Sequence, residues 1–187
     1  MRNSLTEIFR DPPTLFTDRL MLRKIERFDS EDMYEYASLP EVTRFLTWDP
    51  HTDIGYTKKY LAFIAGKYKT FDFYDWAVCL LESGKMIGTC GFSKLDDRNM
   101  SGEIGYVINP LYSGHGYATE AARRVIEFGF SELGLERIEA RYIVENLASR
   151  HIMDKLGMQF EGIHRSSLRQ RGKYVSVGYC SILRNEI

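Results

Sequence analysis

The chain has little net charge, few cysteines and no long apolar run. Its 25 basic and 26 acidic residues leave a formal net charge of -1, so no basic surface for nucleic acid or anionic lipid is indicated. No segment approaches the roughly 20 apolar residues of a membrane span. The first residues are polar and charged and lack the apolar core of a secretory leader. We therefore expect a cytoplasmic protein with no nucleic-acid and no membrane partner.

The three cysteines, Cys79, Cys90 and Cys180, show no CxxC spacing. This spacing argues against a zinc or redox motif, and no metal is expected. Each cysteine lies in an apolar, strand-like run, where a free thiol behaves as a small buried hydrophobe. Unpaired thiols are typical of a reducing compartment.

The 187 residues, 44% hydrophobic and 27% charged, suit one compact globular domain spanning residues 1–187. No repeat or low-complexity linker divides the chain. In the first part, the alternation and spacing of apolar residues predict a strand over 20–25, a helix over 31–38 capped by Ser30, and a helix over 54–68.

The second part begins with three strands, over 76–81, 86–93 and 103–108, that we expect to form an antiparallel meander. The elements expected after it are a helix over 118–133 ended by Gly134, a strand over 137–144, a helix over 147–156 ended by Gly157, and two strands around residues 171–173. This order predicts an α/β (α+β) fold with a mixed, mostly antiparallel sheet of about six to seven strands, about four helices and one strand–helix–strand crossover.

The segment 109–121 carries the most specific signal in the sequence. Pro110 ends a strand, Gly114 and Gly116 allow unusual backbone angles, and an Ala-rich helix follows. A glycine turn at a helix N-terminus presents several free N–H groups to one point, which favours a bound anion. Residues 113–119 are therefore a candidate phosphate cradle, although a tight turn without a ligand is the alternative.

Two common nucleotide motifs do not fit this cradle. GxxxxGK[ST] is absent, which excludes a P-loop NTPase. GxGxxG fails because Thr119 stands at the third glycine, and the preceding strands are predicted to be antiparallel, unlike those of a Rossmann unit.

Residues 113–118, Ser-Gly-His-Gly-Tyr-Ala, resemble motif A of the GNAT (GCN5-related N-acetyltransferase) superfamily, whose signature is Gln/Arg-x-x-Gly-x-Gly/Ala. The extended stretch 116–121 resembles the RimJ/RimL-like subgroup, which acetylates N-termini of ribosomal proteins. Further matches are residues 16–23, 145–150 and 155–158. Ser113 replaces the usual Gln/Arg, so one side-chain contact to coenzyme A is expected to be lost, and Met158 replaces an aromatic residue.

The resemblance implies acetyl-CoA as co-substrate, bound where strands 103–108 and 137–144 splay apart. The pantetheine arm would pair with exposed backbone there, and an amine would attack the thioester directly. The residues implied in binding the donor are Tyr106, Val107, Ile108, Ser113, Gly114, His115, Gly116, Tyr117, Ala118, Thr119, Asn146 and Ser149.

The resemblance also suggests catalytic groups. Many GNAT enzymes carry a tyrosine acid where this chain has Met153, which cannot donate a proton. RimL-like members are thought to use the serine that matches Ser149, so Ser149 is expected to protonate the leaving thiolate, with Tyr142 as a weaker substitute. Asn146 is a further candidate, and its alternative role is to cap the following helix.

The resemblance implies that Glu103, at the start of the strand before motif A, is the base and acts through water; the alternative is an ordinary solvent-facing strand residue. Glu120, in the first turn of the long helix, is interpreted as structural. His115 is expected to be exposed. Trp48 and Tyr142 are expected to contact the acceptor.

The acceptor is expected to be a protein or peptide N-terminus. Neutralising an α-amine at pH 7 costs about 1 kcal/mol, against about 4.6 kcal/mol for lysine, which suits a site with a distant base. A small amine (polyamine, amino acid or antibiotic) and a non-catalytic acyl-CoA sensor are the alternatives. A homodimer stays open as an assembly.

Overall fold

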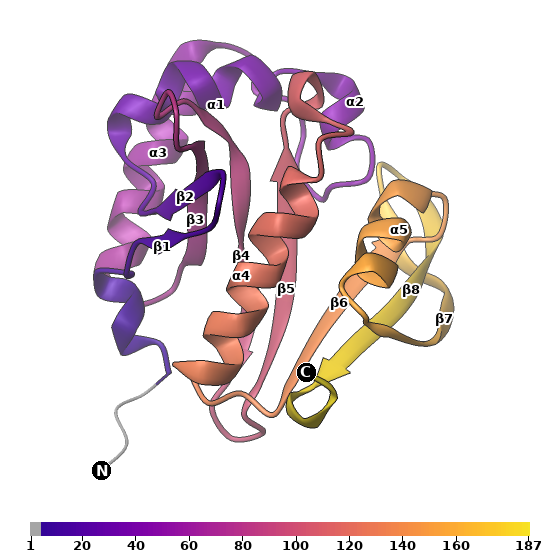
Figure 1. Cartoon of the computed structure of the whole chain (residues 1–187). Helices are drawn as coiled ribbons and strands as arrows, with labels where there is room; N and C mark the ends of the chain where they lie inside the picture. Colours follow the sequence, from indigo (N-terminus) through magenta and orange to yellow (C-terminus); the bar gives the residue numbers. More distant parts are fainter. Residues whose placement is uncertain (1–4) are drawn as a thin grey trace.

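The computed structural model describes residues 5–187 and arranges them around one eight-stranded sheet (Figure 1). The strands are β1 (Leu15–Phe16), β2 (Leu20–Arg23), β3 (Tyr74–Leu80), β4 (Met86–Asp96), β5 (Ser101–Ile108), β6 (Arg137–Ile143), β7 (Gln159–Gln170) and β8 (Lys173–Leu183). The α-helices are α1 (Ser30–Ala37), α2 (Pro40–Thr43), α3 (Ile54–Lys69), α4 (Tyr117–Ser131) and α5 (Leu147–Lys155).

The sheet has the order β1-β2-β3-β4-β5-β6-β8-β7. Neighbouring strands are antiparallel except β5 and β6, which are parallel and are connected through α4. The predicted fold class, meander and crossover are therefore confirmed. The strand and helix numbers were slightly low, because the two-residue β1 and the four-residue α2 are too short to produce a periodic pattern.

One predicted helix start is wrong. Ser30 is the first residue of α1, and Asp29 occupies the N-cap position instead. The Asp29 carboxylate accepts bonds from the Glu26 backbone N–H (2.7 Å) and from Arg23 (2.9 Å), so it closes the short turn before the helix. Ser30 is therefore buried inside the helix rather than placed to cap it.

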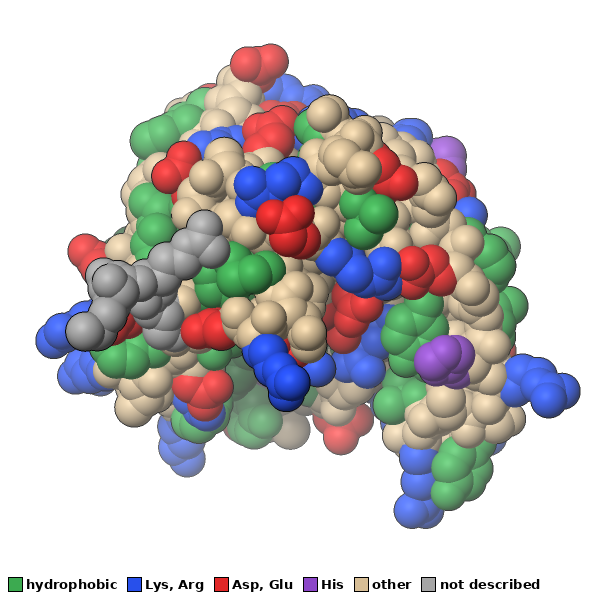
Figure 2. All heavy atoms as spheres, turned by 90° about the horizontal axis from the view of Figure 1, so that it is seen from below, with side chains coloured by type: hydrophobic (Ala, Val, Ile, Leu, Met, Phe, Trp, Pro, Cys, Tyr) green, Lys and Arg blue, Asp and Glu red, His purple; other side chains and the backbone are tan. Residues whose placement is uncertain are grey.

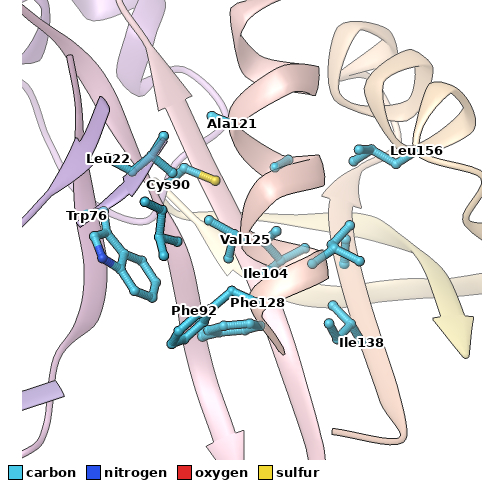
Figure 3. Close-up of a cluster of buried hydrophobic side chains, with 14 of the residues drawn as sticks. Leu22, Trp76, Cys90, Phe92, Ile104, Ala121, Val125, Phe128, Ile138 and Leu156 are labelled. Atoms are coloured by element: carbon cyan, nitrogen blue, oxygen red, sulfur yellow. The ribbon is translucent and has the colours of Figure 1, made fainter. Parts of the chain in front are cut away.

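Two apolar cores lie on opposite faces of the sheet. On one face α4 packs against the strands, and Figure 3 shows Val125 and Phe128 of this helix directed toward Trp76, Phe92 and Ile104. On the other face α1 and α3 cover a second cluster that contains Leu61, Ile64, Ala77 and Cys79. A fully buried side chain such as Phe128 contributes roughly 1.5–3 kcal/mol to folding, so α4 is firmly held against the sheet.

β5 and β6 separate soon after they pair. Their parallel register covers only residues 101–103 of β5 against residues 137–139 of β6. Beyond that point β5 continues to pair with β4 as far as Ile108, while β6 turns toward β8. Figure 1 shows the two ribbons diverging. The predicted splay is therefore present, and it leaves one edge of residues 104–108 without a neighbouring strand.

The charges on the surface are mixed. Figure 2, which views the molecule from below, shows Lys and Arg side chains interspersed with Asp and Glu rather than gathered by sign. Among residues 5–187, none of the helices is long and apolar enough to cross a membrane.

Candidate active site

A cavity of about 1010 Å³ opens where β5 and β6 diverge. Its walls come from α1, α2 and the segment after it, α3, β3, β4, β5, the start of α4, β6, α5, β7 and β8. Ligand pockets are typically about 300–1,000 Å³, so this space lies at the upper end of that range.

The predicted phosphate cradle forms one end of this cavity. Gly114 and Gly116 have φ angles of 79° and 82°, which favour glycine because other residues are strained there. Gly116 is also the N-cap of α4 and has no side chain that could bond the helix amides. The first backbone hydrogen bond of α4 runs from Glu120 N–H to Gly116 O (3.0 Å). The N–H groups of residues 116–119 are therefore available to an anion, and the cradle fits a pyrophosphate.

Two networks hold the cradle in place. Glu120 accepts from the Thr17 hydroxyl (2.5 Å) and from Arg19 Nε (2.8 Å), which ties the first turn of α4 to the β1–β2 loop. Burial alone would raise the pKa of Glu120, but the bonds from Thr17 and Arg19 outweigh it and lower that pKa. On the other side the buried Asn109 accepts from Leu111 N–H (3.1 Å) and donates to Glu35 of α1 (2.7 Å).

In the middle of the cavity, β5 meets α5. The Tyr106 hydroxyl lies 3.1 Å from both the Oγ and the carbonyl oxygen of Ser149. Asn146 Oδ1 accepts from Ser149 N–H (3.2 Å), so Asn146 does cap α5, and its NH₂ group stays free to act as a donor. Burial raises the pKa of Tyr106, which keeps its hydroxyl protonated. Ser149 is thus fixed at the splayed edge by a neutral donor.

Glu103 lies near the start of β5, just before the residues of this strand that line the cavity. Its Oε1 accepts from Arg141 Nε (2.9 Å) and from Ser93 Oγ (2.8 Å). The carboxylate is therefore paired with a guanidinium and a hydroxyl rather than directed at the cavity.

The other end of the cavity has aromatic walls. The His51 ring lies 5.6 Å from Trp48, 4.9 Å from Tyr56 and 5.4 Å from Tyr60. His51 is 6% exposed, and its Nδ1 is 2.9 Å from Thr57 Oγ1. Burial lowers the pKa of His51, so the ring is neutral at pH 7. It lies at the centre of the wall, next to the three aromatic rings.

The tip of the β7–β8 hairpin closes this wall from outside. Gln170 Nε2 donates to Leu46 O (2.8 Å), and Arg171 Nη2 donates to Thr43 O (3.0 Å). Arg171 also has a φ of 45°, an unusual angle for a residue with a side chain. The C-terminal hairpin therefore supports the segment 43–48 that carries Trp48.

The structure brings most of the predicted site residues together. The cavity lining includes Tyr106, Val107, Ile108, Ser113, Gly114, Gly116, Tyr117, Ala118, Thr119, Asn146, Ser149, Trp48 and Tyr142. Glu103 and His115 are not among the lining residues. His115 is exposed, and its ring stacks on Tyr117 with centroids 5.8 Å apart.

Several lining residues were not predicted. They include Tyr36, His51, Tyr60, Asp75, Gly105 and Arg141. Asp75 stands two residues before Ala77 in β3, so alternation would place it on the α1/α3 face of the sheet. A charged residue at the start of a predicted buried strand is the one sequence signal that could have identified it.

Comparisons with known proteins agree with this architecture. A family model described as an acetyltransferase (GNAT) domain matches residues 19–159. The chain is 35% identical to the uncharacterized N-acetyltransferase p20 of Bacillus licheniformis, over 92% of this chain and 97% of that protein. A GNAT-family acetyltransferase structure from Bacillus anthracis has a TM-score of 0.83 at 29% identity, covering 92% of this chain and 99% of that one.

A more distant structure shares the fold alone. It is RimL, a ribosomal L7/L12 alpha-N-protein acetyltransferase solved in complex with coenzyme A, with a TM-score of 0.78 and 17% identity. The likeness covers 91% of this chain and 98% of RimL.

Proposed function

The chain belongs to the GNAT acetyltransferase family, and we propose that it transfers the acetyl group of acetyl-CoA to the α-amine of a peptide or protein N-terminus. The observation that carries the proposal is the free edge of β5 at residues 104–108, which runs from the cradle to Ser149 within one cavity. An extended pantetheine arm can hydrogen-bond to such an edge as an added strand.

The chain's own residues would supply most of what the reaction needs. The amides of residues 116–119 would hold the pyrophosphate. The backbone of residues 106–108 would place the thioester beside α5, where the Asn146 amide can donate to its carbonyl oxygen. Ser149 Oγ would donate to the leaving sulfur while Tyr106 keeps Ser149 in position. Glu103 is the base predicted from the sequence, and it would need a water to reach the amine.

The α-amine acceptor has two supports. RimL, which shares the fold, acts on the α-amine of a ribosomal protein. A neutral α-amine also costs about 3.6 kcal/mol less to form at pH 7 than a neutral lysine amine. The three free cysteines fit the reducing cytoplasm that we propose as its location.

Free-thiol release tests this function. The protein is mixed with acetyl-CoA and a panel of peptides that differ in their first residue, and coenzyme A thiol is followed with time. We expect release with at least one peptide and an acetylated N-terminus by mass spectrometry. Tight coenzyme A binding without release for any amine would instead favour an acyl-CoA sensor.

A small-amine acceptor is the second candidate. The aromatic wall built on His51 and closed by the hairpin tip favours it, because this wall can enclose a compact molecule. The same thiol assay with polyamines, amino acids and aminoglycosides separates the two. If a small amine has a higher kcat/KM than every peptide, the acceptor is a small amine rather than a peptide N-terminus.

A further inference from the structure

We propose that the acceptor amine binds as an ammonium ion over Gly105 and gives its proton to Asp75, and that the acceptor carries no carboxylate beside this amine. The proposal rests on the acetyltransferase function above. It names the class of the acceptor and the residue that meets it.

Asp75 and Gly105 lie in one row across the sheet. Asp75 of β3 is opposite Gly91 of β4, which is opposite Gly105 of β5. Two inter-strand spacings separate Asp75 from Gly105, or about 9–10 Å between backbones. All three residues also line the cavity. An amine between them would have the carboxyl on one side and the backbone that carries the thioester on the other.

Gly105 leaves the space for that amine. A Cβ built on Gly105 has no atom within 4 Å, so the cavity is open directly above the strand. A Cβ on Gly91 would lie 2.2 Å from the Tyr74 backbone oxygen and 2.7 Å from Asp75 Oδ1, so glycine at this position lets β4 approach β3 beside the carboxyl. A side chain at position 105 would therefore fill the proposed amine site, whereas one at position 91 would push β3 and its Asp75 away.

Asp75 is held rigidly but lacks a cation. Its Oδ1 accepts from Trp76 N–H (3.1 Å), the Thr89 hydroxyl donates to its carboxyl, and Tyr68 Oη donates to its backbone carbonyl (2.7 Å). Among residues 5–187, no Lys, Arg or His forms an ion pair with it, whereas Glu103 is paired with Arg141. An acceptor ammonium would supply the missing partner.

The surrounding wall selects against carboxylates. The lining residues numbered 25–75 include no Lys or Arg and four acids. Asp49 and Asp72 pair with Arg171 and Lys67, whereas no cation in the part of the chain that the structure describes pairs with Glu41 or Asp75. Tyr36, Trp48 and Tyr60 supply aromatic surface, which attracts cations and apolar groups. The cavity lining also includes Arg141, which Glu103 already binds, and Lys155, which is the last residue of α5. A carboxylate next to the acceptor amine would be repelled here.

The proton balance is complete. The ammonium loses a proton to the Asp75 carboxylate, and the neutral nitrogen attacks the thioester carbonyl carbon. The new C–N bond forms, the C–S bond breaks, and the sulfur takes a proton from the attacking nitrogen through Ser149. Asp75 returns its proton to solvent after the products leave.

The titration of Asp75 suits this role. Burial raises its pKa to about 7, so it is poised to accept a proton near neutral pH. The titratable groups that interact electrostatically with it are Tyr36 of α1, Tyr60 and Tyr68 of α3 and, on the opposite face of the sheet, Cys90 of β4, and burial raises the pKa of each. All four are therefore neutral near pH 7, and His51 is neutral because its pKa is lowered.

The first test compares phenylalaninamide with phenylalanine as acceptors for the wild-type protein and acetyl-CoA. The two share the side chain and differ in the carboxylate, which also makes the amine more basic, so kcat/KM is expressed per neutral amine. We expect kcat/KM for the amide to be higher by about tenfold or more, the effect of one unfavourable charge contact. Equal values, or a preference for phenylalanine, would overturn the acceptor class.

The second test measures Asp75→Asn in the same assay. Asparagine keeps the shape and the bond from Trp76, so the fold should survive, and Glu82→Gln is the matched control in the turn after the same strand. We expect Asp75→Asn to lower kcat/KM for the amide roughly 100-fold with unchanged coenzyme A affinity. A wild-type rate for Asp75→Asn would overturn the assignment.

Binding separates this proposal from the proposed function. Calorimetry with phenylalaninamide and the coenzyme A complex should show binding to wild type and weaker binding to Asp75→Asn and to Gly105→Val. Valine suits a strand and fills only open space. This binding pattern without any thiol release would contradict the proposed acetyltransferase reaction but would support the amine-binding site at Asp75 and Gly105. Equal binding to all three proteins would sink the site.

Discussion

The Tyr106 hydroxyl of β5 and the Ser149 Oγ of α5 lie 3.1 Å apart, at the point where the sheet opens. Replacing Ser149 with alanine removes the donor to the leaving sulfur, so we expect kcat to fall by about 100-fold. Coenzyme A affinity should change little, because the cradle is untouched. Stopped-flow thiol release and a coenzyme A titration check this pair of outcomes. Full activity in Ser149→Ala would leave Tyr142 as the candidate acid.

The backbone angle of Gly116 makes a second prediction. Alanine at φ 82° is strained by roughly 1–2 kcal/mol, so Gly116→Ala should relax the turn and weaken coenzyme A binding by about tenfold. Gly66→Ala is the control, because Gly66 lies in α3 and a Cβ there contacts nothing. It should bind coenzyme A normally and unfold at an equal or higher temperature. Equal affinities in both variants would contradict the role of the cradle.

Glu120 should matter for stability rather than for catalysis. Its bonds from Thr17 and Arg19 lower its pKa, so its stabilisation is present above the unfolded value of 4.5 and fades as pH falls below it. We expect Glu120→Gln to cost about 1 kcal/mol at pH 7. Thermal unfolding at several pH values measures this, and the difference from wild type should shrink in acid. A constant difference would argue against the charged pair.

Asp75 should show the opposite dependence. Its pKa rises from 3.8 to about 7 on folding, so the folded state binds the proton more tightly than the unfolded chain. The ionised form therefore costs stability above pH 7, and this cost disappears as pH falls toward 3.8. Asp75→Asn should melt at a higher temperature than wild type at pH 8, with a smaller gap at pH 5. An equal or lower melting temperature at pH 8 would contradict the buried charge.

Arg171 should influence the acceptor and not the donor. Arg171→Ala removes its bonds to Thr43, which are worth about 1 kcal/mol, so KM for the acceptor should rise about fivefold. Arg169→Ala is the control, since Arg169 is exposed and lies two residues away on the same hairpin. Steady-state kinetics with each substrate varied in turn should show no change in KM for acetyl-CoA. Equal effects of both variants would indicate a general loss of hairpin structure.

The cradle and the fold class could be predicted because their signals are local. Gly114, Gly116 and the Ala-rich helix are adjacent in the sequence, and the order of strands and helices fixes the crossover. Asp75 could not be predicted in the same way. The role proposed for Asp75 depends on the strand register that places it in one row with Gly91 and Gly105, and only the assembled sheet defines this register.

The environment of Glu103 illustrates the same limit. Its place at the start of a strand could be predicted, but its ion pair depends on Arg141 of β6, which becomes a neighbour only through the parallel pairing of β5 and β6. The short elements β1 and α2 lack a full period of side chains, so tertiary contacts rather than local pattern define them.

The contact between the hairpin tip and the segment 43–48 has a consequence for engineering. Gln170 and Arg171 bind backbone carbonyls of residues more than 120 positions earlier, so the acceptor wall is one unit encoded in two distant parts of the gene. A chimera that receives this segment from a relative but keeps its own hairpin would combine mismatched halves. Transplanting acceptor preference between members of the family therefore calls for exchanging both parts together.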